Sequence, residues 1–179
     1  LFSNLSVLSN VVIASNLDAT YNMADAIFKT KKYREREKHL EEKAMDLLEV
    51  VGLADKANEQ ANSLPYGHQR KLEIARAMAL DPKLLLLDEH TAALDPATAE
   101  KVLALTKKIV AENHITCLMI THNIPSALSL GNRTIMMNNG RIVLELAGAE
   151  RENMTTEQLL KVFHEQGVSN DRILFSAES

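Results

Sequence analysis

Two adjacent carboxylates follow an apolar run in the middle of the chain. Asp88 and Glu89 come directly after four consecutive leucines, residues 84–87. An apolar strand that delivers two carboxylates to its end is unfavourable unless a cation lies there. Magnesium with phosphate oxygens is the usual solution, in which one carboxylate organises Mg²⁺ and its neighbour orients or deprotonates an attacking water. The alternative is a strand that simply ends in the cap of a helix.

A histidine follows a second apolar run. His122 comes just after the segment Ile115–Ile120. A neutral imidazole at that position can accept a hydrogen bond from a water and donate one to a phosphate oxygen. A lone histidine is more often structural, but this one follows Asp88 and Glu89 by one strand–helix–strand unit. The other histidines show no metal-ligand spacing with Cys117 or with one another, which argues against a zinc site.

The third feature is a glycine at the expected start of a helix, in the segment Leu64–Arg70 (LPYGHQR). Gly67 lets backbone N–H groups approach an anion, and the helix dipole favours an anion there. A plain helix cap is the alternative.

The apolar spacing predicts the elements that must position these residues. Strand, helix and strand over residues 84–120 form a βαβ unit of a parallel sheet, and their continuous apolar runs predict strands buried on both faces. Functional groups of such sheets lie just past the carboxyl ends of the strands. The predicted elements are a helix from near Ser6, an amphipathic helix Arg34–Val51 ended by Gly52, a helix His68–Leu80, a strand Leu84–Leu87, a helix capped by Asp95-Pro96 and ending near Glu112, a strand Ile115–Ile120, a hairpin turning at Asn139-Gly140, and a helix from a Thr155/Gln158 capping box to His164.

Composition and charge narrow the class of protein. The chain has 179 residues, 46% of them hydrophobic and 25% charged, which suits one domain or one large fragment of a domain. A net charge of −4 does not favour nucleic acid, and a single cysteine excludes an intramolecular disulfide. With no spanning apolar segment and no signal-peptide pattern, a cytoplasmic location is expected. Because the chain opens at Leu1 inside an apolar pattern, we expect a missing N-terminal part.

Taken together, these motifs resemble the ATP-binding cassette (ABC) ATPases. The segment Leu64–Pro96 is similar to that family's signature helix, Walker B strand and D-loop in unbroken order, and Met119–His122 resembles its switch-histidine strand. The resemblance implies an α/β chain with a partial P-loop NTPase (ABC ATPase) fold. A helical subdomain (1–80, including the signature helix) would be followed by a parallel-sheet βαβ ATPase core with a hairpin (81–150) and a C-terminal helical extension (151–179).

The resemblance also implies roles for single residues, with ATP and Mg²⁺ as cofactors. Asp88 would be the Walker B aspartate near Mg²⁺, Glu89 the catalytic glutamate, and His122 a contact of the γ-phosphate. The D-loop aspartate would act across a dimer, and the signature loop would cap ATP held by the opposite subunit. The implied nucleotide-binding residues are Leu64, Tyr66, Gly67, His68 and Asp95.

Three positions depart from the commonest family pattern. Pro65 stands where a serine usually contacts phosphate, and Tyr66 where a glycine is usual; branched-chain amino-acid importer ATPases carry a similar version. His90 replaces a usual proline, a form that looks more like a different, poorly characterised importer group. The two halves of the chain thus resemble different importer subfamilies.

The P-loop motif is absent from the chain, because none of its glycines is followed by lysine. We therefore expect the full-length protein to be an ATPase that powers an ABC membrane transporter, an importer of amino acids or similar small solutes, and the chain alone to be nearly inactive. The expected partners are transmembrane permease subunits, which hold it on the inner face of the membrane, and a second ATPase subunit; no nucleic acid is expected. Apolar residues near Leu17 to Phe28 are the expected docking surface for the permease. The alternatives are a non-transport ABC ATPase, or an inactive chain that only binds a partner.

Overall fold

The computed structural model describes residues 1–15, 28 and 30–165. The described chain divides into two compact units, Leu1–Leu118 and Met119–Ser179, and each is described by itself below. The elements of the first unit are α1 (Val7–Ser15), α3 (Lys31–Val50), the 3₁₀ helices η2 (Ala54–Lys56) and η3 (Ala61–Ser63), α4 (Tyr66–Met78), β1 (Leu84–Asp88), α5 (Pro96–Glu112) and the start of β2 (Thr116–Ile120). The second unit adds α6 (Ile124–Ser129), β3 (Arg133–Asn138), β4 (Arg141–Ala147), α7 (Gly148–Asn153) and α8 (Thr156–Glu165).

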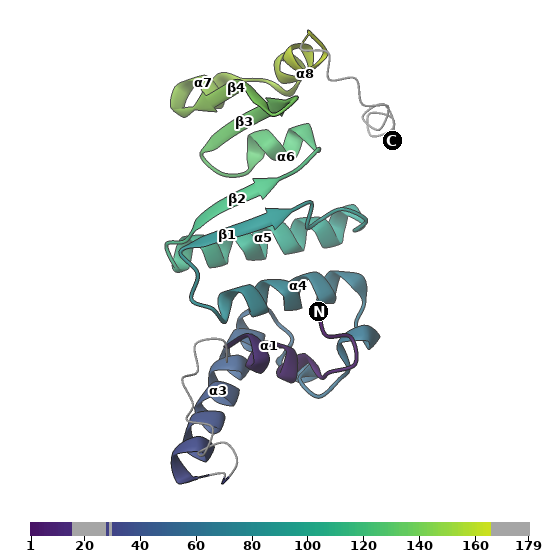
Figure 1. Ribbon diagram of the computed structural model, residues 1–179. Helices are drawn as coiled ribbons and strands as arrows, with labels where there is room; N and C mark the ends of the chain where they lie inside the picture. Colours follow the sequence, from purple (N-terminus) through teal and green to yellow (C-terminus); the bar gives the residue numbers. More distant parts are fainter. Residues whose placement is uncertain (16–27, 29, 166–179) are drawn as a thin grey trace. The chain divides into compact units, whose positions relative to one another are not determined.

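Among the described residues before β1, α1 packs against both α3 and α4 (Figure 1). The N–H of Ser9 donates to the Ser6 hydroxyl at 3.0 Å, so the predicted cap of α1 is confirmed. The predicted amphipathic face of α3 is also confirmed, since it is buried through Leu40, Ala44 and Leu48.

A buried asparagine fixes the path of the chain before α1. Asn10 is fully buried, and its amide donates to the carbonyls of Phe2 and Ser6, each at 3.0 Å, while its Oδ1 accepts from the Phe2 N–H at 2.9 Å. A buried amide is stable only when it is hydrogen-bonded in this way. Asn10 therefore holds Phe2 near the start of α1.

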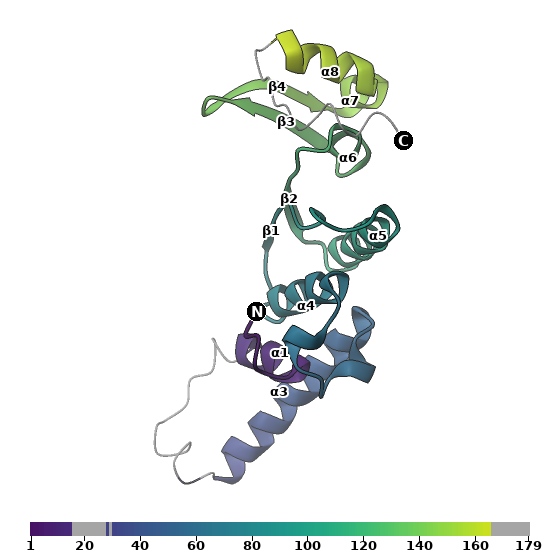
Figure 2. The same cartoon turned by 90° about the vertical axis from the view of Figure 1, so that its right-hand side faces the viewer.

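The β1–α5–β2 segment confirms the predicted strand–helix–strand order, and β1 and β2 are neighbours in one sheet. Figure 1 shows the two strands running in the same direction, and Figure 2 shows α4 and α5 on one side of β1. Asp95 caps α5, whose bounds match the prediction closely.

The prediction that both faces of the strands are buried is wrong for the described residues. Leu85 and Leu87 are only 4% and 8% exposed, whereas Leu84 and Leu86 are 58% and 59% exposed. In β2, Leu118 is likewise 50% exposed. The reason is that α4 and α5 cover one face of the strands, and no described segment of the first unit covers the other.

The second unit is built around a hairpin and its covering helices. The β3–β4 pair is antiparallel, and its turn has positive φ at Asn139 (49°) and Gly140 (72°), as a type I′ turn requires. The predicted capping box is confirmed: Thr155 N–H donates to Gln158 Oε1 at 2.9 Å, and Gln158 N–H to Thr155 Oγ1 at 3.2 Å. The core of the unit consists of Ile124, Leu146 and Leu159, from α6, β4 and α8.

Two short helices, α6 and α7, do not follow from the apolar spacing. A local signal for α6 was present, because Asn123 precedes a proline in the first turn and its Oδ1 accepts from Ser126 N–H at 2.8 Å. No helix of the described residues is long and apolar enough to cross a membrane. Of the expected docking segment Leu17–Phe28, only Phe28 is described, and it is 79% exposed; residues 168–179 also lie outside the described residues.

Candidate functional site

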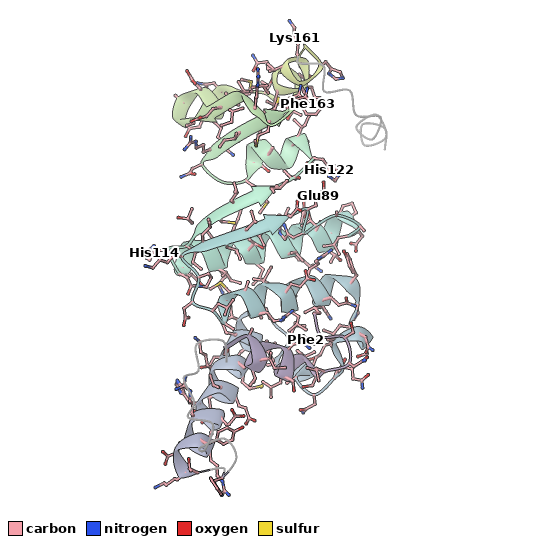
Figure 3. The ribbon with its side chains drawn as sticks, viewed as in Figure 1. Phe2, Glu89, His114, His122, Lys161 and Phe163 are labelled. Carbon is pink, nitrogen blue, oxygen red and sulfur yellow. The ribbon has the colours of Figure 1, made fainter. Side chains whose placement is uncertain are left out.

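The two carboxylates lie at the carboxyl end of β1. Asp88 is the last residue of the strand and Glu89 follows it, and both are exposed. Figure 3 shows Glu89 beyond this end of the strand, with His114 at the opposite end of the same sheet. Glu89 has a φ of 42°, in the left-handed region that residues with a Cβ rarely adopt. A strained residue of this kind often marks a functional site.

The next residue, His90, is buried, with 6% of its surface exposed. It shares a cavity of about 170 Å³ with Arg70 and Glu73 of α4 and with residues 85–88 of β1. No described residue forms a hydrogen bond with its Nε2 atom. Burial, together with the nearby charge of Arg70, lowers the pKa of His90, and Glu73 opposes this only in part. The sequence marks His90 only as a departure from the family pattern.

The segment that resembles the ABC signature forms the entry and first turn of α4. Leu64 is buried, and its carbonyl accepts from Gln69 Nε2 at 2.9 Å. Tyr66 is 42% exposed, and the Arg70 guanidinium lies 4.6 Å from the centre of its ring. Arg70 also donates to the Tyr66 hydroxyl, and it pairs with Glu73 at 2.6 Å.

Gly67 lies where α4 meets α5. It is buried, and a Cβ added to it would lie 2.5 Å from the Thr98 Cγ2 atom. The next residue, His68, has a buried Nδ1 with no hydrogen-bond partner in the described part of the chain. Close helix packing is thus a reason for glycine at position 67 in addition to the anion approach expected from the sequence.

Asp95 is the N-cap of α5, and its Oδ2 accepts from the Thr98 N–H at 2.9 Å. Hydrogen bonds from the side chain and the N–H of Thr98 lower the pKa of Asp95. The first unit therefore brings together three of the predicted motifs: the signature-like turn, the carboxylates after β1, and Asp95. Thr98 joins the first and the third, and no sequence pattern indicated it.

His122 belongs to the second unit, where it follows β2 and is exposed. The next residue, Asn123, is the N-cap of α6, since its Oδ1 accepts from the Ser126 N–H at 2.8 Å. The structure thus confirms that His122 stands at the end of a strand, as the sequence predicts.

The residues at the end of β1 suit a hard cation. Among the described residues, no group of three or more His, Cys, Asp or Glu side chains could hold a metal alone. Mg²⁺ does not need such a group, since it is usually held by one or two carboxylates together with waters and phosphate oxygens. The exposed Asp88 carboxylate supplies this kind of ligand.

A larger cavity, of about 340 Å³, lies between α1 and α4 and is lined in part by Phe2, Ile13, Arg76 and Leu80. The Arg76 guanidinium lies 5.2 Å from the centre of the Phe2 ring, which Figure 3 labels. No residue of the predicted phosphate motifs lines this cavity. Its size alone does not make it the catalytic site.

Comparison with known proteins agrees with this arrangement. Residues 1–92 match the family model described as "ABC transporter", and the chain belongs to that family. The tyrosine transport ATP-binding protein of Clostridioides difficile (strain R20291) is 38% identical over 162 residues, 89% of this chain and 63% of that protein. The high-affinity branched-chain amino acid transport ATP-binding protein BraF of Pseudomonas aeruginosa is 35% identical over 140 residues, 78% of this chain and 55% of that protein.

A solved structure extends the similarity to the fold. The dimeric ATP-binding cassette MJ0796, in a post-hydrolysis state bound to ADP and Pi, has a TM-score of 0.64 and 30% sequence identity with this chain. The match covers 82% of this chain and 58% of that one. The chain therefore spans between half and two thirds of the length of these three proteins.

Proposed function

We propose that the protein containing this chain is the ATP-hydrolysing subunit of an ABC importer for amino acids or similar small solutes. It would act as a dimer with a second ATPase subunit and would bind transmembrane permease subunits at the cytoplasmic face of the membrane. The names of the similar proteins, which transport tyrosine and branched-chain amino acids, support the class of solute.

The observation that carries this proposal is the packing of three motifs in one structural unit. The turn after β1 leads from Glu89 to Asp95, which caps α5. Gly67, in the signature-like turn, lies directly against Thr98 in the first turn of α5. The first unit therefore holds the two carboxylates expected to serve hydrolysis together with the groups expected to contact a nucleotide across a dimer.

The proposed roles follow from the chemistry of the side chains. Asp88 would hold Mg²⁺, which when bound neutralises charge on the phosphates. Glu89 would orient the attacking water and take its proton, and His122 would donate to a phosphate oxygen. Leu64, Tyr66, Gly67, His68 and Asp95 would meet the nucleotide held by the opposite subunit.

The test is Glu89→Gln in the complete protein. Loss of a general base should lower ATP hydrolysis by at least about 10²-fold, while ATP binding is retained and the ATP-bound dimer accumulates. Glu100→Gln, which changes an exposed residue of α5, is the matched control and should leave the rate unchanged. Hydrolysis near the wild-type rate in Glu89→Gln would remove Glu89 from this role.

Two further measurements test the role of His122 and the transport function separately. His122→Ala should lower turnover and affect nucleotide affinity less, as measured by steady-state hydrolysis and by titration with a fluorescent ATP analogue. Uptake of labelled amino acids by cells with and without the gene tests the importer. Unchanged uptake of every amino acid, with ATP hydrolysis intact, would favour an ABC ATPase with another task.

A further inference from the structure

The turn between β1 and α5 contains a single buried side chain. Within residues 88–95, all of which are described, only His90 is buried; the residues on either side of it are exposed or half-buried. The imidazole reaches back against α4, where Arg70 and Glu73 line the same cavity. His90 is therefore the residue through which this turn packs against α4, the helix that begins with the signature-like segment.

The residue before His90 needs such a fastening. Glu89 has a φ of 42°, and a left-handed residue with a Cβ persists only where its surroundings hold it. Further along the turn, the Ala92 N–H donates to the Glu89 carbonyl at 2.8 Å, and Asp95 caps α5. Directly after Glu89, His90 is the residue that is buried.

The cavity beside the imidazole has a volume of about 170 Å³. The Nε2 atom of His90 is itself buried and has no partner among the described side chains. What the imidazole contributes here is therefore its bulk, which fills space against α4.

We propose that His90 is a positioning residue for Glu89: its buried imidazole fastens the turn after β1 to α4 and so sets the direction of the Glu89 carboxylate. This inference rests on the proposed function, because the positioned group is the proposed general base. His90 itself does not touch the reacting atoms.

The first test is steady-state kinetics of His90→Ala in the complete protein. A general base displaced by a fraction of an ångström loses rate steeply, so kcat should fall about ten-fold or more. The KM for ATP should stay within about two-fold, because all the proposed nucleotide contacts except Asp95 lie before α4 or in its first turn, outside residues 88–95. His114→Asn, which replaces an exposed histidine of the same unit, is the control and should match the wild type.

The second test separates positioning from general support of the fold. In a Glu89→Gln background the base is already absent, so His90→Ala should cause no further loss in the residual rate. A loss of equal size in both backgrounds would show that His90 acts only through stability and would overturn the inference. Unchanged kcat in His90→Ala would overturn it as well.

Two more variants keep the test decisive should His90→Ala fail to fold. His90→Leu, which fills the same space without a polar atom, should recover most of the wild-type kcat, whereas His90→Ser, which leaves the space empty, should not. Wild-type kcat in His90→Ser would overturn the inference. If Glu89→Gln abolishes hydrolysis while the His90 variants do not change it, only this inference fails; if the wild type hydrolyses no ATP, the proposed function fails and the inference with it.

Discussion

At the scale of the residue, Gly67 illustrates how packing can demand a residue type that chemistry also favours. A Cβ at this position would lie 2.5 Å from the Thr98 methyl carbon, closer than two carbon atoms can approach. Thr98 cannot turn away freely, because it is β-branched and hydrogen-bonds to the Asp95 cap. The contact between α4 and α5 therefore depends on a missing side chain.

We expect Gly67→Ala to destabilise the complete protein by about 1–3 kcal/mol, the usual cost of overpacking. Thr98→Ser removes the opposing methyl group and keeps the hydroxyl, so the double variant should recover most of the loss. Urea unfolding of the wild type, both single variants and the double variant gives the coupling free energy. Since alanine is otherwise favoured over glycine in a helix, a stabilised Gly67→Ala protein would contradict the close contact.

At the scale of the element, Arg151 joins the helices and the hairpin of the second unit. Its Nε donates to Thr134 Oγ1 at 3.0 Å, and its Nη2 donates to the carbonyl of Leu130 at 2.7 Å and to that of Leu128. These carbonyls lie at the end of α6, where helical carbonyls have no partner within the helix. One side chain on α7 therefore completes the hydrogen bonding of another helix.

Arg151→Met should lower the free energy of unfolding of the second unit by about 2–3 kcal/mol, because hydrogen bonds to charged groups are lost and carbonyls are left unpaired. The matched control is Arg133→Met, which breaks an ion pair with Glu145 in which the side chains are 57% and 45% exposed. An exposed pair contributes at most about 1 kcal/mol. Hydrogen exchange of the β3–β4 amides would measure both effects, and equal losses would contradict the role given to Arg151.

At the scale of the whole molecule, the apolar face of β1 is the main feature that the described chain leaves open. Leu84 and Leu86 alternate with the buried Leu85 and Leu87 along one strand. Neighbouring leucines are thus alternately exposed and buried, so the effect of substituting an exposed leucine can be compared with that of substituting a buried one. An open apolar patch of this kind favours self-association.

The 179-residue chain, prepared alone, should self-associate through this face. Leu86→Glu should reduce the association measured by light scattering, because it places a charge on the exposed face. Leu85→Glu, one residue away, should instead unfold the chain, because an unpaired charge is then buried in the contact with the helices. The same response to both substitutions would contradict the one-sided burial of β1.

The same chain should not bind MgATP in the micromolar range, and it should show no turnover above background. The sequence contains no P-loop motif, whose backbone N–H groups and lysine hold the β- and γ-phosphates. Isothermal titration calorimetry on the 179-residue chain measures this directly. Micromolar affinity would show that the residues present are sufficient to bind the nucleotide.

The sequence by itself determined the elements whose signals are local. The cap at Asp95, the Asn139-Gly140 turn and the Thr155/Gln158 box each act over a few residues, so they could be predicted and are confirmed. The order of the motifs, with carboxylates after one strand and His122 after the next, could be predicted for the same reason. These features depend on backbone preference and apolar spacing, which are properties of short segments.

Only the tertiary structure decided which side chains meet across the fold. The contact of Gly67 with Thr98, the burial of His90 beside the exposed Glu89, and the carbonyls bound by Arg151 all join residues whose pairing no local pattern encodes. The burial of β1 was mispredicted for the same reason, since a run of leucines shows that a strand is apolar but not which of its faces a helix covers. Burial and close packing depend on contacts between distant segments, and those exist only once the chain has folded.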